Sequence, residues 1–62
     1  MIPLFYTAHY IVIAEKIREE HSKGNPETQL AIETLAFKLA AYFAQDNANF
    51  KREVFLQACG IT

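Results

Sequence analysis

The sequence has little of several residue types that small proteins use to stabilise a fold or build a site. Its 62 residues include one cysteine, Cys59, which excludes an internal disulfide. The two histidines, His9 and His21, lie 12 residues apart on one predicted helix, too far along its axis to share a zinc ion. The two glycines, Gly24 and Gly60, stand alone, so no glycine-rich phosphate-binding loop is present.

Excess charge and long apolar runs are also missing. Six lysines and arginines against seven acidic residues give a net charge of −1, without the basic footprint that duplex DNA or an anionic membrane requires. The apolar runs are too short and too interrupted to span a bilayer. Residues 1–6 lack the basic start of a signal peptide, and the chain has a lone thiol. We therefore expect a cytoplasmic protein without membrane contact.

Apolar and aromatic residues are plentiful, at 52% and 13% of the chain. One domain over residues 1–62 is near the lower size limit for independent folding. Ordering costs about 1.5 kcal/mol per residue, which the core of so small a chain only about cancels. Proteins of this size depend on disulfides, metals or oligomerisation. The sequence therefore predicts self-association, or an unusually efficient core.

The segment 26–46 is the clearest helix. Asn25 is a good N-cap, Pro26 suits the first helical position, and Glu27 favours the positive end of the helix dipole. An uninterrupted run rich in alanine and leucine follows.

Two further helices flank this one. Thr7 is the expected cap of a helix over 7–23, which Gly24 ends, and the short turn to Pro26 makes the two helices antiparallel. After a break at 47–49, Asn49 is expected to cap a short helix over 50–59, ended by Gly60. The fold class is therefore all-α with three helices. Residues 1–6 form an arm that packs on the core or is exchanged between subunits.

Each predicted helix has more than one apolar side, at about 100° per residue. The broad face of the long helix comprises Ile32, Leu35, Ala36, Leu39, Tyr42 and Phe43. Its second stripe comprises Leu30, Phe37, Ala41 and Ala44. The first helix has its main stripe at Tyr6, Tyr10, Ile13, Ala14 and Ile17. On the last helix, Phe55, Leu56 and Cys59 share one side, and Phe50, Val54 and Ala58 another.

The second stripe predicts an oligomer interface, because a helix that is apolar on two sides is normally buried on both. Ile11 and Val12 fall outside the main stripe of the first helix and extend the apolar surface. The expected assembly is a homo-oligomer, most simply a twofold dimer. Its predicted interface residues are Leu30, Phe37, Ala41, Ala44, Ile11 and Val12.

Two motifs, HYIVIAEKI at 9–17 and NFKREVFLQACGI at 49–61, flank the alanine-rich helix. With that helix, the chain resembles short proteins of tailed bacteriophages that carry H-Y-x-x-I-A-x-x-I and N-x-x-F-D-R-E-x-F-L-x-A-C-G. The resemblance implies a phage accessory protein and no particular reaction. Lys51 departs from it, standing where those proteins usually have aspartate. The third helix thereby loses its usual cap, which favours a start at Asn49.

No constellation for catalysis is visible. Cys59 has no sequence-adjacent base, and no motif holds two carboxylates together in a dry cleft. We therefore expect no enzyme, no cofactor and no metal. A DNA-binding helix-turn-helix is the competing interpretation for three helices. The long central helix counts against it, as do the only two cations on the last helix, Lys51 and Arg52.

A binding function remains, and the sequence offers two candidates for it. In the first, aromatic rings and cations hold a nucleotide-like signalling ligand between subunits, as a phage counter-defence protein would. The candidate residues are Tyr6, Tyr10, Arg18, Phe50, Lys51 and Arg52, for which core packing or solvated charge is the competing interpretation. In the alternative, the exposed apolar helix face docks on a host protein as an inhibitor or adaptor.

Overall fold

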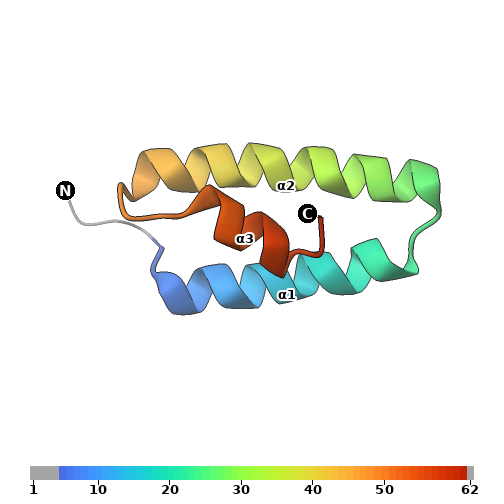
Figure 1. Cartoon of the computed structure of the whole chain (residues 1–62), viewed down its shortest axis with the longest axis horizontal. Coiled ribbons are helices and arrows are strands. Elements are labelled where there is room, and N and C mark those ends of the chain that lie inside the picture. Colours follow the sequence, from blue (N-terminus) through green and yellow to red (C-terminus); the bar gives the residue numbers. More distant parts are fainter. Residues whose placement is uncertain (1–4, 62) are drawn as a thin grey trace.

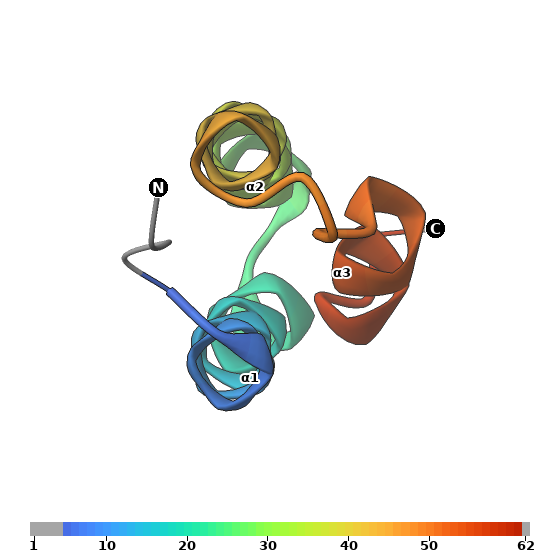
Figure 2. The same cartoon turned by 90° about the vertical axis from the view of Figure 1, so that its left-hand side faces the viewer.

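Three helices make up the protein (Figure 1). The computed structural model describes residues 5–61, in which no strand occurs. Helix α1 spans Thr7–Lys23, α2 spans Pro26–Asp46 and α3 spans Arg52–Ala58. The first two are antiparallel, and α3 packs across one side of the pair, so that an end-on view shows a triangle of helices (Figure 2). The predicted all-α, three-helix class is confirmed. The predicted arm lies outside the described residues, except for Phe5 and Tyr6.

The turn between α1 and α2 follows from its capping residues. The Asn25 side chain accepts a hydrogen bond from the Thr28 amide at 2.9 Å, and Pro26 is the first helical residue. Gly24 ends α1, and its amide donates to the His21 carbonyl. It is extended, at φ −80° and ψ 154°, and a Cβ there would lie 3.0 Å from Thr28 Cγ2. Close approach to α2 therefore favours glycine here.

The cap expected for α1 is wrong. Tyr6 occupies the N-cap position, and Thr7 is the first helical residue. The amide of Tyr6 donates to Nδ1 of His9 at 3.0 Å. The imidazole of His9, the third residue of α1, thus accepts from the backbone amide of the N-cap residue.

The cap expected for α3 is also wrong. Helix α3 begins at Arg52, and Lys51 stands in the N-cap position. Lysine carries donors only, so its side chain cannot accept from the first amides of the helix. Asn49 lies in the preceding loop, where its amide donates to Oδ1 of Asn47 at 2.9 Å. The departure from the phage pattern therefore falls on the residue that should cap this helix.

Replacing Lys51 with aspartate is expected to stabilise the fold, because a carboxylate at the N-cap accepts from free helix amides. The gain is about 1 kcal/mol, or about 4–8 °C in melting temperature for a domain of this size. Thermal unfolding followed by circular dichroism measures it. Asn49→Asp, which adds a carboxylate outside the cap position, is the control. Equal melting temperatures for wild type and Lys51→Asp would contradict the assignment of the cap.

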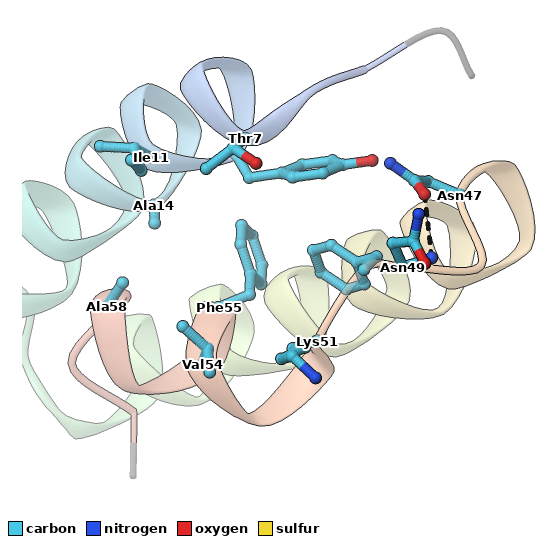
Figure 3. Close-up of a pocket in the computed structure, with 11 residues that line it drawn as sticks. Thr7, Ile11, Ala14, Asn47, Asn49, Lys51, Val54, Phe55 and Ala58 are labelled. Atoms are coloured by element: carbon cyan, nitrogen blue, oxygen red, sulfur yellow. Dashed lines mark hydrogen bonds between the residues drawn. The ribbon is translucent and has the colours of Figure 1, made fainter. Parts of the chain in front are cut away.

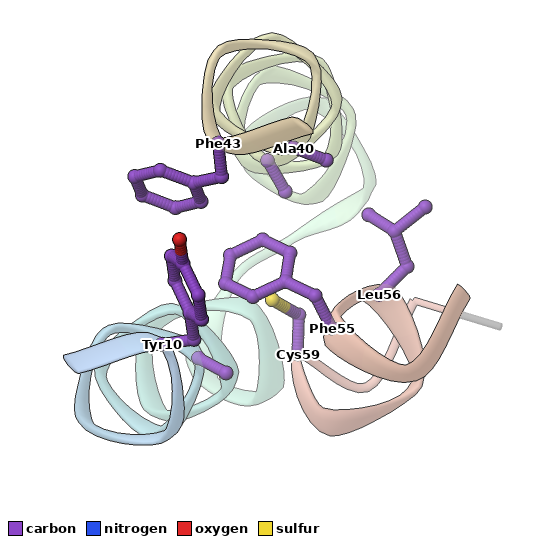
Figure 4. Close-up of a cluster of buried hydrophobic side chains, with 8 residues drawn as sticks. Tyr10, Ala40, Phe43, Phe55, Leu56 and Cys59 are labelled. Carbon is purple, nitrogen blue, oxygen red and sulfur yellow. The ribbon is translucent and has the colours of Figure 1, made fainter. Parts of the chain in front are cut away.

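A compact apolar core fills the space where the three helices meet (Figure 4). Its buried members are Tyr10, Ala14, Ala36, Ala40, Phe43, Phe55, Leu56 and Cys59. The alanines let the helices approach closely, and Phe43 fills the centre with 2% of its surface exposed. Its ring centroid lies 5.0 Å from that of Tyr10 and 5.5 Å from that of Phe55. Phe43 therefore packs α2 against both α1 and α3.

The buried side of α2 is rotated from the predicted broad face. It is centred on Ala36, Ala40 and Phe43, whereas Leu35 and Tyr42, both predicted to be core, are 53% and 47% exposed. Because α2 must face two helices at once, its buried side points between them. Small Ala40 is buried there, and Leu35 and Tyr42 fall about a quarter to a third of a turn away.

The second stripe of α2 is largely exposed, except at Ala44, which is half-buried. Leu30 is 64% exposed and Phe37 is 50% exposed, so neither side chain is buried by another part of the molecule.

Candidate functional site

An apolar groove of about 290 Å³ lies between α1 and the stretch that leads into and through α3 (Figure 3). Two buried rings, Tyr10 and Phe55, contribute to its lining, as do the exposed side chains of Ile11 and Val54. The described residues that line it are Thr7, Tyr10, Ile11, Ala14, Asn47, Asn49, Phe50, Lys51, Val54, Phe55 and Ala58. Phe50, Val54 and Ala58, which the sequence spacing grouped together, thus all line this groove, Val54 and Ala58 from α3 and Phe50 from the loop before it.

The groove has a polar end and an apolar end. Asn47 and Asn49 lie together at the end nearest the α2–α3 loop, and Lys51 lies where this loop enters α3, with its amino group pointing away from the aromatic rings (Figure 3). Ala14 and Ala58 lie at the opposite end, where the side chains are small. Among the described residues of the lining, Lys51 is the only charged one and none carries a carboxylate. The groove therefore suits a ligand that is apolar along its length and negatively charged at one end.

The aromatic rings in the lining pack on one another. The Tyr10 and Phe50 ring centroids are 4.7 Å apart at an interplanar angle of 64°, and those of Phe50 and Phe55 are 5.5 Å apart. Tyr10 is 9% exposed, and its hydroxyl donates to the Phe5 carbonyl at 3.1 Å. These rings form the floor of a groove, and their faces are not free to stack on a base from both sides.

Three of the six predicted ligand-binding residues line the groove, and three do not. Tyr10, Phe50 and Lys51 line the groove, and Tyr6, Arg18 and Arg52 do not. Tyr6 is 51% exposed beside His9. The aliphatic stem of Arg18 lies against Gly60, and Arg52 is exposed. Sequence reasoning did not assign Thr7, Asn47 or Asn49 to a site. In the sequence, Asn47 indicated only a chain break, and Asn49 indicated a break and a helix cap.

The six predicted interface residues also lie on different surfaces. Leu30, Phe37 and Ala41 are exposed along α2, and Ala44 is half-buried. On α1, Ile11 lines the groove and Val12, also exposed, does not. About 100° separates these two neighbours around the helix.

The other polar side chains of interest serve the fold. His21 Nε2 lies 2.8 Å from Glu33 Oε2, and the side-chain amide of Gln29 donates to the His21 carbonyl. These contacts join α1 to α2 near their connecting turn. Among residues 5–61, no group of three potential ligands could hold a metal ion. No helix in the described part of the chain is long and apolar enough to cross a membrane.

The Cys59 thiol is fully buried in the core. Burial raises its pKa from an ordinary 9.0 to about 11, because the charged thiolate is disfavoured away from water. The thiol is therefore protonated near neutral pH and is a poor nucleophile. A packing role fits this environment.

Above pH 9 the unfolded chain releases the Cys59 proton while the folded chain retains it, so stability should fall as the pH rises toward 11. The loss is roughly 3 kcal/mol at about 1.4 kcal/mol per pH unit. Denaturant unfolding across this range measures it, and Cys59→Ala provides the control for other alkaline titrations. Identical pH dependence in both proteins would contradict the effect of burial.

Comparison of the chain with protein-family models, with curated proteins and with solved structures found no match.

Proposed function

We propose that this chain is a non-catalytic binding protein that docks on another protein through the apolar groove between α1 and α3. The observation that carries this proposal is the groove itself, with Ile11 and Val54 exposed by 52% and 59% at its surface. Contiguous exposed apolar surface is typical of interaction sites. The closely packed rings favour a macromolecular partner over a stacked base.

The resemblance to short phage proteins supplies the setting for this proposal. A phage accessory protein acts inside the host cell, and a small binder without catalytic groups works by occupying a host component. We therefore place the chain in the host cytoplasm, in counter-defence, as an inhibitor or adaptor of a host protein.

Self-association is the second part of the proposal, through the exposed stripe Leu30, Phe37, Ala41 and Ala44. Its large side chains, Leu30 and Phe37, precede its small ones, Ala41 and Ala44, along α2. An antiparallel pairing of two α2 helices about a twofold axis near Phe37 would place Leu30 opposite Ala44 of the second copy.

The expected dimer is concentration-dependent. Burying Leu30 and Phe37 from both copies is worth about 6–12 kcal/mol at about 1.5–3 kcal/mol each. Association costs about 4–15 kcal/mol. These terms are similar in size, and Ile11 and Val12 lie on α1, not on the helix that carries the stripe.

A nucleotide-like ligand, sequestered without turnover, is the second candidate. The observation that favours it is the polar end of the groove, where Lys51 could hold a phosphate and Asn47 and Asn49 offer amides. Thermal-shift measurements with cyclic and linear nucleotides test it, since a ligand at 100 times its dissociation constant adds about 2.7 kcal/mol. A shift that Lys51→Ala abolishes would favour this candidate.

Capture from infected cells tests protein docking, with two valines as a matched pair. Val54→Glu places a charge in the groove, and Val12→Glu places the same charge on α1 outside it. We expect the Val54→Glu protein to lose a captured host protein that wild type and Val12→Glu retain. Retention of the same partner by Val54→Glu would overturn docking through the groove.

A further inference from the structure

We infer that the groove binds one amphipathic helix of about two to three turns, contributed by another protein and carrying a carboxylate at the end that meets Lys51. This inference rests on the proposed docking function and names the chemistry of the partner.

The shape of the groove suits a helix. Its walls are two helices, α1 and α3, and the seven residues of α3 extend about 10 Å at 1.5 Å per residue. Ala14 and Ala58 keep one end free of large side chains, which permits the interaxial distances of about 8–10 Å found between packed helices. A guest helix would become a fourth helix beside α1 and α3.

Backbone hydrogen bonding also favours a helix over an extended segment. The residues that line the groove belong to two helices and one loop, and no strand in residues 5–61 offers an edge to pair with. An extended guest would leave amides and carbonyls without partners against an apolar surface, which is costly. A helix satisfies these groups internally and presents only side chains.

Charge determines the direction in which the guest lies. Of the lining residues that the structure describes, Lys51 is the only charged one, and it lies where the α2–α3 loop enters α3. The positive end of the α1 dipole also lies near this end, but the Asp46 carboxylate, which accepts from the Phe5 amide at 3.2 Å, already offsets part of it. The preference for an anion therefore depends on Lys51. A carboxylate beside Lys51 is favoured, and a second cation is repelled.

Two synthetic helical peptides test the inference by fluorescence anisotropy with the full chain. Both have leucines spaced to form one face. One carries glutamates at one end, and the other carries lysines there. We expect wild type to bind the glutamate peptide at least about tenfold more tightly, a difference of about 1.4 kcal/mol. Lys51→Asp, which should be more stably folded, is expected to reverse this preference, so unfolding cannot account for the change.

Neighbouring residues provide the controls. Arg52→Asp makes the same charge change at an exposed cation outside the lining, and it should alter affinity for the glutamate peptide much less than Lys51→Asp does. Val54→Glu should abolish binding of both peptides, and Val12→Glu should not. Failure of wild type to bind the glutamate peptide would overturn the inference, as would equal affinity for both peptides or unchanged binding by Val54→Glu.

The two proposals fail in different ways. If the peptides fail but Val54→Glu still loses a partner captured from infected cells, docking stands and the acidic helix is wrong. If Val54→Glu retains both the peptides and the captured partner, the groove is not a docking site. Loss of peptide binding in Phe37→Asp, but not in Val54→Glu, would place the contact on α2 and also overturn the inference.

Discussion

Phe43→Ala is expected to leave the chain largely unfolded at room temperature. Phe43 is 2% exposed, and its ring packs among those of Phe5, Tyr10, Phe50 and Phe55. Truncating a buried phenylalanine costs about 3–5 kcal/mol. A domain of this length has only about 3–9 kcal/mol of stability in total, at 0.05–0.15 kcal/mol per residue. Circular dichroism at 222 nm with urea unfolding measures the change.

Phe37→Ala is the matched control, because it removes the same side chain from the exposed side of the same helix. At dilutions where the wild type is monomeric, it should lower the free energy of unfolding by less than about 1 kcal/mol, as surface substitutions usually do. Similar losses for the two variants would show that the core is not centred on Phe43.

Phe37→Asp is expected to turn a concentration-dependent dimer into a monomer. In the proposed pairing, two copies of Phe37 lie near the twofold axis, and each contributes about 1.5–3 kcal/mol. Losing both weakens dimerisation by about 100- to 10,000-fold at 1.4 kcal/mol per factor of ten. The two added carboxylates also repel one another. Light scattering and sedimentation over a wide range of chain concentration measure the mass.

Leu35→Asp controls for the general effect of an added charge on α2. Leu35 is 53% exposed, close to the 50% of Phe37, and lies about 160° away around the helix. Its substitution should leave the mass unchanged. Wild-type mass for Phe37→Asp, or equal loss of mass in both variants, would refute an interface on this stripe.

Local sequence signals were enough to predict the fold class. Asn25, Pro26 and the alanine-rich run that follows define α2 without reference to the rest of the chain. The caps at Tyr6 and Lys51 were mispredicted for separate local reasons. His9 supplies the acceptor at the start of α1, and α3 begins without any side-chain cap.

The rotation of α2 could not be predicted from its own pattern. Hydrophobicity alone predicts that Leu35 is buried and does not predict burial of Ala40, but in the structure Leu35 is exposed and Ala40 is buried. The direction of burial depends on where α1 and α3 lie. The composition of the candidate site also depends on tertiary packing that the local sequence does not show. Lys51 and Tyr10 were among the predicted site residues, but Asn47 and Thr7 join them only through tertiary packing.

Helix α3 is seven residues long and starts without a capping side chain. Isolated helices shorter than about 12–15 residues are marginal in water, so α3 persists only while its apolar side remains docked on α1 and α2. One wall of the groove is therefore expected to be the least protected part of the molecule in amide hydrogen exchange. Any guest that fills the groove should slow this local opening, so occupancy and the order of the carboxyl-terminal segment would rise together.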